Sequence, residues 1–485
     1  MKTNREQQAI DELGSTEVSH KLSVTISLFF ILSIAVIPVI QLGKIKLPEI
    51  PREEGLLRSN QNLISSFKKF ENFIIDSFPL NHLRPKLQTA LVSLGEGNNQ
   101  VIIGKDEWLF HKESTDFLLK GTFEVESVKE VILDFNHQLS KRGIELILMP
   151  VPVKAIVHSE KLFHDGSLLK NPYYQQLINE LEIKVFDSTK ILYEAKNTQS
   201  YLKSDTHWTP HAMEEVAKKL AQLIKPHSST NNLLKPISNE VINQGDIKRQ
   251  LNISQSKNEQ VKTNQIYTNN GSLWAPNLKS DVLLLGDSFT NIYSLQSMGW
   301  GFSAGLAEHI SNNLGKSIDC IAINNGGANE TRQELARQYA NGIDRLKGKK
   351  TLIWQFSMRD LITKKWQKIK LGRKKVLEST FLKINGEVNI RGTIAARSSS
   401  PAPDRVTYKD HIFSIHLKNI NGENKEAVIY VQGMKDGKLT QAALWRIGQE
   451  ISLKVEPWSD RSGISRSELE DESLLLELPL WGVPD

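Results

Sequence analysis

Val282-Leu283-Leu284-Leu285 is followed at once by Gly286-Asp287-Ser288-Phe289. Four consecutive apolar residues predict a strand buried on both faces, as in a parallel sheet that helices cover on each side. Ligands in open α/β sheets bind beyond the carboxyl ends of the strands, so Ser288 stands where a reacting group is expected. The Gly-Asp-Ser tripeptide alone is a weak signal, because such a serine is often only a helix N-cap.

Strands and helices alternate on both sides of this segment. Strands are expected at 144–151, 185–187, 318–323 and 351–356, and helices at 125–142, 171–182, 210–224, 303–315 and 330–345. Thr209 and Pro210 supply an N-cap and a first helical residue for the third of these helices. The alternation predicts an α/β fold with a doubly wound, mainly parallel sheet. Residues 100–110 precede it as a hairpin with its turn at 104–107.

Changes in composition mark the other parts of the 485-residue chain. Residues 225–280 are rich in Asn, Ser, Lys and Gln with little periodicity, so an irregular insertion is expected there. After about residue 378, short β-like runs separated by turn residues predict a β-sandwich or barrel, which the segment 468–485 could close. The predicted organisation follows the chain: a tail at 1–21, an apolar segment at 22–42, a helical stalk at 43–94, an α/β domain at 95–377 and a β module at 378–485.

Leu22 to Leu42 contains no charged residue, and about 20 helical residues span a hydrocarbon core of roughly 30 Å. A cleaved signal peptide is the alternative, but its apolar region is usually shorter and ends in a small-x-small site, which 41–46 does not offer. An uncleaved anchor is therefore favoured. The flanking basic residues do not fix its orientation, and a single N-terminal anchor before a large body favours a body outside the cytoplasm. Pro79 and Pro85 are expected to break the helical pattern of the stalk.

Cysteine content and charge exclude some classes of function. The single cysteine, Cys320, excludes an internal disulfide framework and a cysteine-rich metal site. The net charge of +6 is modest, but seven of the twelve residues from 364 to 375 are basic. Attraction to an anionic polymer or to lipid head groups is one interpretation, and a solvated helix face with a connector is the favoured one. Nucleic acid is not an expected partner, because no nucleic-acid-binding module accompanies these residues.

A second motif, Asp205-Thr206-His207-Trp208, supplies what Ser288 lacks. A serine hydroxyl needs a base to remove its proton, and histidine titrates near neutral pH. The imidazole in turn needs an acidic partner on its other nitrogen, and Asp205 lies two positions away. Alone, each residue could equally be a helix cap or an ordinary histidine. Together the two motifs predict a triad of Ser288, His207 and Asp205.

Several stretches together resemble the alginate-type polysaccharide O-acetyltransferases, extracytoplasmic proteins with an SGNH-hydrolase-like domain. These stretches are 104–110, 205–212, Gly245-Asp246-Ile247, 282–289 and the closing strand and turn at 352–361. In most SGNH hydrolases the serine precedes an Asp-x-x-His pair. Here an Asp-x-His pair comes first, which is the arrangement of this acetyltransferase family. The resemblance covers roughly residues 95–365 and implies that Ser288 is the nucleophile, His207 the general base and acid, and Asp205 its orienting partner.

The family resemblance also suggests where an oxyanion would be held. SGNH folds keep a glycine and an asparagine after the strand predicted at 318–323, where this chain has Asn324-Asn325-Gly326 without a Gly-x-Asn-Asp pattern. Donors are therefore expected from the N–H of Ser288 and from among Asn324, Asn325 and Gly326. Three side chains are weaker candidates for a sugar groove, with packing or a helix surface as the favoured alternative: Tyr293, Trp300 and Arg332.

The resemblance implies a two-step reaction in which an acetyl group passes through an acetyl-serine to a hydroxyl of an extracellular polysaccharide, alginate or another. It also implies a membrane-bound O-acyltransferase partner that supplies the acetyl group. The 22–42 anchor would hold the protein beside it, single-pass in the bacterial inner membrane with a periplasmic catalytic domain. Neither a metal nor a cofactor is expected, since the histidines do not cluster as ligands do. A carbohydrate esterase with the same triad is one alternative. The other is a non-catalytic polysaccharide-binding or assembly protein, with the C-terminal β module and the basic run at 364–375 as its working surface. Trp445 and Trp458 could stack on sugars there, although burial is the commoner outcome for such residues.

Overall fold

A computed structural model describes residues 24, 27–28, 80–162, 168–224, 235–251, 253, 258–372, 380–403, 406–458 and 464–484. The chain forms two compact units, Met1–Gln88 and Thr89–Asp485. Nearly all of the expected anchor at 22–42 lies outside the described residues, and within the described part no helix has the length and apolar character needed to cross a membrane.

Helix α4 (Leu80–Ser93) continues through Pro85. The expected break at Pro85 is therefore wrong.

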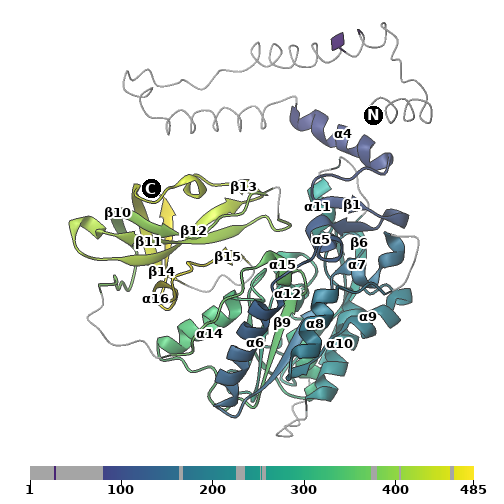
Figure 1. The fold of residues 1–485 in the computed structure, drawn as a ribbon, viewed down its shortest axis with the longest axis horizontal. Coiled ribbons are helices and arrows are strands. Elements are labelled where there is room, and N and C mark those ends of the chain that lie inside the picture. The colour runs from purple at the N-terminus through teal and green to yellow at the C-terminus, as the bar shows by residue number, and fades with distance from the viewer. Residues whose placement is uncertain are drawn as a thin grey trace, which may run out of the picture. The chain divides into compact units, whose positions relative to one another are not determined.

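A five-stranded parallel sheet is the centre of the second unit (Figure 1). Its strands lie in the order β4-β3-β9-β7-β8, with these bounds: β3 (Glu145–Val151), β4 (Lys184–Val185), β7 (Val282–Gly286), β8 (Asp319–Ala322) and β9 (Thr351–Ser357). Every pairing in this sheet is parallel. The prediction of a parallel α/β sheet is confirmed.

Helices cover both faces of the sheet because successive strand residues point to opposite sides. Ile147 and Met149 belong to one hydrophobic core, and Leu146 and Leu148 belong to the other. The first core includes α10 (Pro210–Leu223) and α13 (Leu306–Leu314), and the second includes α6 (Val125–Ser140), α8 (Pro172–Glu180) and α14 (Glu330–Ala340). Shorter helices connect these elements: α5 (Lys112–Leu119), α7 (Lys154–Val157), α9 (Thr189–Glu194), α12 (Ser288–Asn291) and α15 (Asp360–Thr363).

Two pairs of antiparallel strands flank the sheet. The predicted hairpin is present as β1 (Val101–Ile103) and β2 (Leu109–His111). The expectation of an irregular insertion at 225–280 is wrong for much of that range, because β5 (Lys235–Asn243) pairs along its whole length with β6 (Glu259–Tyr267), and α11 (Asp246–Leu251) lies between them in sequence. Most of β5 is exposed, so no apolar alternation marks it in the sequence.

The C-terminal strands form a closed barrel. Pairings run in a ring through β12, β16, β14, β10 and β11 and back to β12, while β13 and β15 pair with β12 and β11. The bounds are β10 (Val388–Arg397), β11 (His411–Lys418), β12 (Ala427–Lys435), β13 (Lys438–Leu439), β14 (Glu450–Pro457), β15 (Ser465–Ser467) and β16 (Leu480–Pro484), with α16 (Glu472–Leu475) before the last strand. The tail supplies the closing strand as expected.

Trp445 is buried in the barrel core and Trp458 packs edge-on against Tyr430, so neither indole is a free platform for a sugar.

The basic run at 364–375 is described up to residue 372 and contains no helix there. Three of its lysines form ion pairs with carboxylates from other segments: Lys364 with Glu330, Lys365 with Glu470 and Lys368 with Glu130. Of the favoured interpretation, the helix face is therefore wrong in this stretch, and the connector is right: residues 364–372 form a connector held by ion pairs.

Candidate active site

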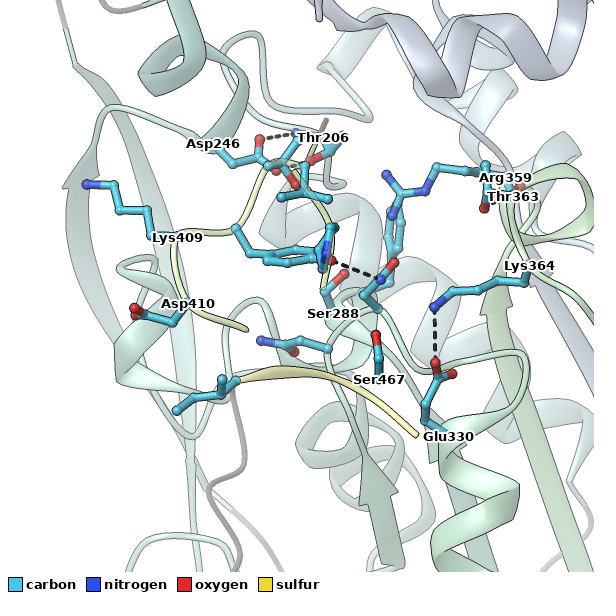
Figure 2. A pocket seen from close by; sticks show the side chains of 18 of the residues that line it. Thr206, Asp246, Ser288, Glu330, Arg359, Thr363, Lys364, Lys409, Asp410 and Ser467 are labelled. Carbon is cyan, nitrogen blue, oxygen red and sulfur yellow. Dashed lines mark hydrogen bonds and ion pairs between the residues drawn. The ribbon is translucent and has the colours of Figure 1, made fainter. Parts of the chain in front are cut away.

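A cavity of about 870 Å³ opens beside the carboxyl end of β7 (Figure 2). Ser288 and His207 line it from the α/β part of the second unit. Tyr408 and Ser467 line it from the barrel strands and their connections. The cavity therefore has walls from both parts of this unit.

A tight turn presents Ser288 at the end of β7. A Cβ on Gly286 would meet Thr290 Oγ1 at 2.2 Å, so only glycine fits at the last strand position. The Asp287 carboxylate caps α12 by accepting the N–H two residues later at 2.8 Å. It also accepts from Gln355 Nε2 of the neighbouring strand β9 at 2.7 Å. The Asp287 carboxylate thus closes the turn and also ties it to β9. Ser288 is the first residue of the short helix α12.

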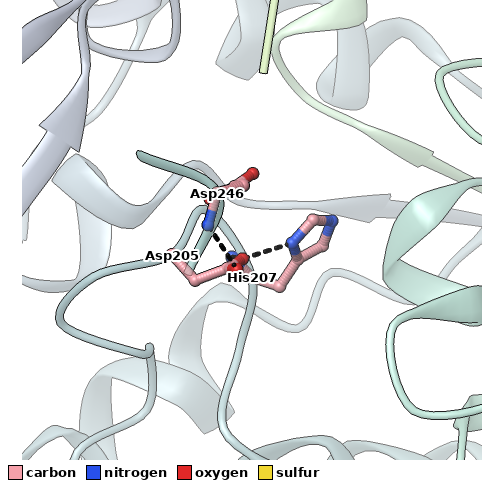
Figure 3. A group of neighbouring side chains, drawn as sticks. All are labelled: Asp205, His207 and Asp246. Atoms are coloured by element: carbon pink, nitrogen blue, oxygen red, sulfur yellow. Dashed lines mark hydrogen bonds and ion pairs between the residues drawn. The ribbon is translucent and has the colours of Figure 1, made fainter. Parts of the chain in front are cut away.

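The structure brings the three predicted triad residues into one hydrogen-bonded chain. Ser288 Oγ lies 2.9 Å from His207 Nε2. On the other side of the ring, His207 Nδ1 lies 2.7 Å from Asp205 Oδ1 (Figure 3). With the Nδ1 proton donated to the carboxylate, Nε2 is left as an acceptor for the serine hydroxyl. The arrangement can remove a proton from Ser288.

Asp205 is held by more donors than His207 Nδ1 alone. Its Oδ1 also accepts the His207 backbone N–H at 3.1 Å, and its Oδ2 accepts the Asp246 backbone N–H at 2.9 Å and Trp300 Nε1 at 2.8 Å. Four donors fill the capacity of one carboxylate. Sequence reasoning assigned no role to Asp246, although it lies in the Gly245-Asp246-Ile247 stretch of the family resemblance. Trp300 was a weaker candidate for a sugar groove, but its side chain is fully buried, as the favoured packing alternative has it.

Among the expected oxyanion donors, the Ser288 N–H takes part in none of the hydrogen bonds between described residues. Asn324 lines the cavity, and its Oδ1 accepts from Asn291 Nδ2 at 2.9 Å. Asn325 also lines the cavity, with its backbone in the left-handed region at φ 60°. Gly326 is a wrong candidate, because its N–H donates to the Ile323 carbonyl at 2.8 Å.

Residues 101–358 match the family described as ALGX: SGNH hydrolase-like domain, acetyltransferase AlgX. The chain belongs to this family. Its membership confirms the resemblance drawn from the sequence motifs and supports the acyltransferase class.

Two curated relatives carry the name "Probable alginate O-acetylase AlgJ". The protein from Azotobacter vinelandii is 29% identical over 164 residues, covering 32% of this chain and 42% of its own length. The protein from Pseudomonas aeruginosa PAO1 is 28% identical over 189 residues, covering 37% and 48%. The matched part thus spans less than half of each relative. The solved O-acetyltransferase domain of Pseudomonas putida AlgJ is 19% identical with a TM-score of 0.42, covering 54% of this chain and 92% of that domain.

Electrostatics at this AlgX-family site favour the protonated form of His207 beside an ionised Asp205. Burial alone would lower the pKa of His207, but the hydrogen bond and charge of Asp205 outweigh it and raise the pKa above its ordinary value. Burial alone would raise the pKa of Asp205, but the hydrogen bond and charge of His207, followed by the Trp300 and Asp246 hydrogen bonds, lower it. The neutral, proton-accepting form of His207 therefore increases as the pH rises through a pKa above 6.5.

Asp205, His207 and Asp246 lie close enough together to be considered as metal ligands (Figure 3). Each carboxylate oxygen of Asp205 already accepts two hydrogen bonds. The Asp246 carboxylate accepts from both the backbone N–H and the hydroxyl of Thr206. A cation would have to displace these donors, so the donor set of this AlgX-family site fits a hydrogen-bonded triad better than a metal centre.

The two remaining groove candidates lie in the protein interior. Tyr293 is fully buried and donates its hydroxyl to the Trp208 carbonyl at 2.6 Å. Arg332 is also buried, with its guanidinium 4.5 Å from the centre of the Trp354 ring and 2.8 Å from the Ala328 carbonyl. Neither side chain lines a groove, and both are packing residues, which was the favoured alternative for them.

Replacing Trp300 with phenylalanine is expected to lower kcat by about 10-fold, the scale of one hydrogen bond to a charged group. The substitution removes the indole N–H that fixes Asp205 Oδ2, and the pKa of Asp205 rises as a result. Steady-state kinetics measure the effect. The matched control is Trp366→Phe, since Trp366 Nε1 donates to the Asp360 carbonyl at 3.0 Å, outside the triad. Equal losses of kcat in the two variants would contradict a role for Trp300 in holding Asp205.

Proposed function

We propose that this protein is an O-acetyltransferase that moves an acetyl group through an acetyl-Ser288 intermediate to a hydroxyl of an extracellular polysaccharide. The observation that carries the proposal is the continuous Ser288–His207–Asp205 hydrogen-bond chain at the wall of an open cavity. The family match and the names of the two curated relatives support the same reaction class.

In the first step, His207 Nε2 takes the Ser288 hydroxyl proton while Oγ attacks the carbonyl carbon of an acetyl donor. The bond to the donor's leaving oxygen or sulfur breaks, and His207 returns the proton to that atom. The N–H of Ser288 and the side chain of Asn324 are proposed to stabilise the negative oxygen. Asp205 stays ionised and stabilises the imidazolium.

In the second step, a sugar hydroxyl gives its proton to His207 Nε2 and attacks the acetyl carbon of acetyl-Ser288. The Ser288 Oγ–acetyl bond breaks, Oγ takes the proton back, and an acetylated sugar leaves. The cavity wall contributed by the barrel, with Tyr408 and Ser467, is proposed to hold the polysaccharide so that its hydroxyl reaches the intermediate in preference to water.

The acceptor is proposed to be anionic because one arginine that lines the cavity forms no ion pair with a carboxylate of the described residues. Arg359 lines the cavity near Ser288 and Thr363 (Figure 2). No hydrogen bond or ion pair between described residues uses its guanidinium. Its charge is nevertheless felt nearby, since the pKa of His111 is lowered to about 3, first by burial and then by Arg359. A planar guanidinium binds the carboxylate of a uronic acid through two parallel hydrogen bonds.

Replacing Arg359 with glutamine is expected to raise the KM for an anionic oligosaccharide by about 10-fold or more, the scale of a hydrogen bond between two charged groups. The KM for a neutral oligosaccharide is expected to change much less. Initial rates over a range of each acceptor measure both constants. Arg391→Gln is the matched control, because Arg391 is an exposed barrel arginine that pairs with Glu450 outside the cavity. An equal rise of KM for both acceptors would contradict the anionic preference.

The proposed function is tested by incubating the full-length protein with an acetyl-ester donor, with and without an oligosaccharide. An acetylated oligosaccharide that depends on Ser288 identifies a transferase. Free acetate alone, at a rate that the oligosaccharide does not change, identifies the esterase alternative. Turnover that does not depend on Ser288 would contradict both the transferase and the esterase hypotheses. A polysaccharide-binding or assembly protein would then be the remaining hypothesis.

We further propose that residues 22–42 anchor the protein in the bacterial inner membrane with the catalytic domain, 95–377, on the periplasmic side. A membrane-bound O-acyltransferase is the proposed source of the acetyl group, and residues 378–485 form the accompanying β module. Support for this topology comes from the apolar sequence of 22–42 and from the family membership of residues 101–358.

A further inference from the structure

A buried lysine, Lys154, contacts the backbone of the loop that carries Asp205 and His207. Lys154 is the first residue of α7 and is 3% exposed. Its Nζ donates to three backbone carbonyls: Leu109 at 2.6 Å, Lys203 at 2.8 Å and Asp205 at 3.1 Å. Three acceptors match the three N–H groups of an ammonium.

These carbonyls come from two segments that are distant in sequence. Leu109 begins β2, whereas Lys203 and Asp205 belong to the loop that carries the triad acid and base. Glu259 of β6 holds the same loop from another side by accepting the Lys203 N–H and the Ser204 N–H, each at 3.0 Å. The backbone of the Asp205–His207 loop is therefore fixed by a cation and a carboxylate together.

The surroundings of Lys154 show that this is not an ordinary buried ion pair. No carboxylate lies within ion-pair distance of its Nζ among the described residues. The rings of Trp108 and Phe110 have their centres 5.1 and 5.2 Å from Nζ. Burying an ammonium is costly, and an apolar side chain of similar length would fill the same space without that cost. The charge and its three directed N–H groups are what an apolar residue could not replace.

We infer that Lys154 is a positioning residue of the acetyl-transfer reaction, whose ammonium fixes the backbone of the Asp205–His207 loop and places a positive charge beside that pair. This inference rests on the proposed function. The fixed Asp205 carbonyl sets the direction of the Asp205 carboxylate, and the carboxylate in turn sets the orientation of the His207 ring.

The charge of Lys154 has a definite sign of effect on the base. A cation beside His207 disfavours the imidazolium, so it opposes the rise in pKa that Asp205, Asp246 and Asp287 produce. Burial lowers the pKa of Lys154 to about 7, while the charges of Glu259, Asp205 and Asp246 oppose that shift. Removing the charge is therefore expected to raise the pKa of His207 and to move the acid limb of the kcat/KM profile to higher pH.

The chain offers a matched control in Lys349. Lys349 is also 3% exposed, and its Nζ donates to the carbonyls of Leu278 at 2.7 Å and Ser280 at 2.8 Å. It pairs with Asp319, which begins β8, at the opposite end of that strand from the catalytic cavity. A general need for a buried ammonium would affect both lysines, whereas a positioning role for the triad would affect Lys154 alone.

The test compares Lys154→Met, Lys154→Arg and Lys349→Met in the full-length protein. The His207 imidazole is titrated by NMR, which does not require turnover, and kcat/KM is measured against pH. We expect Lys154→Met to raise the His207 pKa and to lower kcat/KM about 10- to 100-fold, the scale of a small misplacement of catalytic groups. Lys154→Arg is expected to keep the His207 pKa near its starting value, and Lys349→Met to leave both the pKa and the pH profile unchanged.

An unchanged His207 pKa in a folded Lys154→Met protein would overturn the inference. If Lys154→Met does not fold, Lys154→Arg tests the inference instead. This variant keeps the positive charge, so the His207 pKa should stay near its starting value. A rise of the His207 pKa in Lys154→Arg would overturn the inference. If the parent protein shows no Ser288-dependent transfer, the proposed function fails. The NMR titration does not require turnover, so it still tests whether Lys154 affects the His207 pKa.

Discussion

Replacing Ser288 with alanine is expected to lower the rate of acetyl transfer by a factor of about 10⁴ to 10⁶, the loss seen when a member of such a triad is removed. In the proposed mechanism, the substitution deletes the oxygen that His207 activates and that carries the acetyl group between donor and sugar. The residual rate would come from binding and from the oxyanion donors. The free energy of unfolding should change little, because the deleted hydroxyl is partly exposed and hydrogen-bonds only to His207 among the described residues.

Ser297→Ala is the control for this prediction. Ser297 is exposed and lines the same cavity, but it makes no hydrogen bond to the triad. The assay follows transfer from an acetyl ester to an oligosaccharide, and mass spectrometry of the intact protein detects the acetylated form. We expect the parent and Ser297→Ala proteins to become acetylated and the Ser288→Ala protein to remain unmodified. An acetylated Ser288→Ala protein with normal turnover would place the nucleophile elsewhere.

The largest expected effect on stability comes from a buried charge cluster between α14 and the barrel. Arg466 lies 2.9 Å from Glu334 and 3.2 Å from Glu468, and Arg337 lies 2.7 and 3.0 Å from the same two carboxylates. The side chains of Arg337 and Arg466 are only 3% and 4% exposed. Arg466→Met is expected to lower the free energy of unfolding by about 3–5 kcal/mol, because it leaves the carboxylates of Glu334 and Glu468 with one buried cation, Arg337, between them.

Arg391→Met tests the same kind of change at the surface. Arg391 and Glu450 form a 2.7 Å ion pair on the barrel, but their side chains are 66% and 54% exposed. Such a pair contributes about 0–1 kcal/mol. Urea unfolding of both variants measures the difference. Similar losses for Arg466→Met and Arg391→Met would show that burial of the cluster contributes nothing.

The contact between the two catalytic motifs was predictable because each motif lacks what the other supplies. Ser288 follows an apolar strand without a base, and the Asp205–His207 pair has an acid and a base without a nucleophile. The sheet was predictable for a related reason: strands buried on both faces must be apolar throughout. The sequence pattern therefore carried both the layer architecture and the three residues at the centre of the candidate site.

The donors around Asp205 were not predictable in the same way. Trp300 and the Asp246 backbone N–H reach the carboxylate from segments 95 and 41 positions away. Lys154 bonds only to backbone carbonyls, which carry no signature of residue type. A single sequence shows neither long-range proximity nor backbone acceptors, so the sequence offered Trp300 only as a packing residue or a weaker groove candidate.

Gly326 failed as a candidate for a different physical reason. A glycine after a strand suggests an accessible N–H, but its N–H is already used by the turn in which it lies. The ribbon of β5 and β6 was missed because an exposed strand needs no apolar face. In each case the sequence records which residue is present, while the outcome depends on which hydrogen-bonding groups remain unused after folding.

The order of strands in the barrel has a consequence during synthesis. β16 pairs with both β12 and β14, although it follows them in the chain. Until residues 480–484 have emerged from the ribosome, those two strands keep open edges that could pair with another chain. The barrel side of the catalytic cavity, including Ser467, is translated before this closing strand. The three residues of the Ser288–His207–Asp205 chain are therefore synthesised before the strand that closes the barrel beside their cavity.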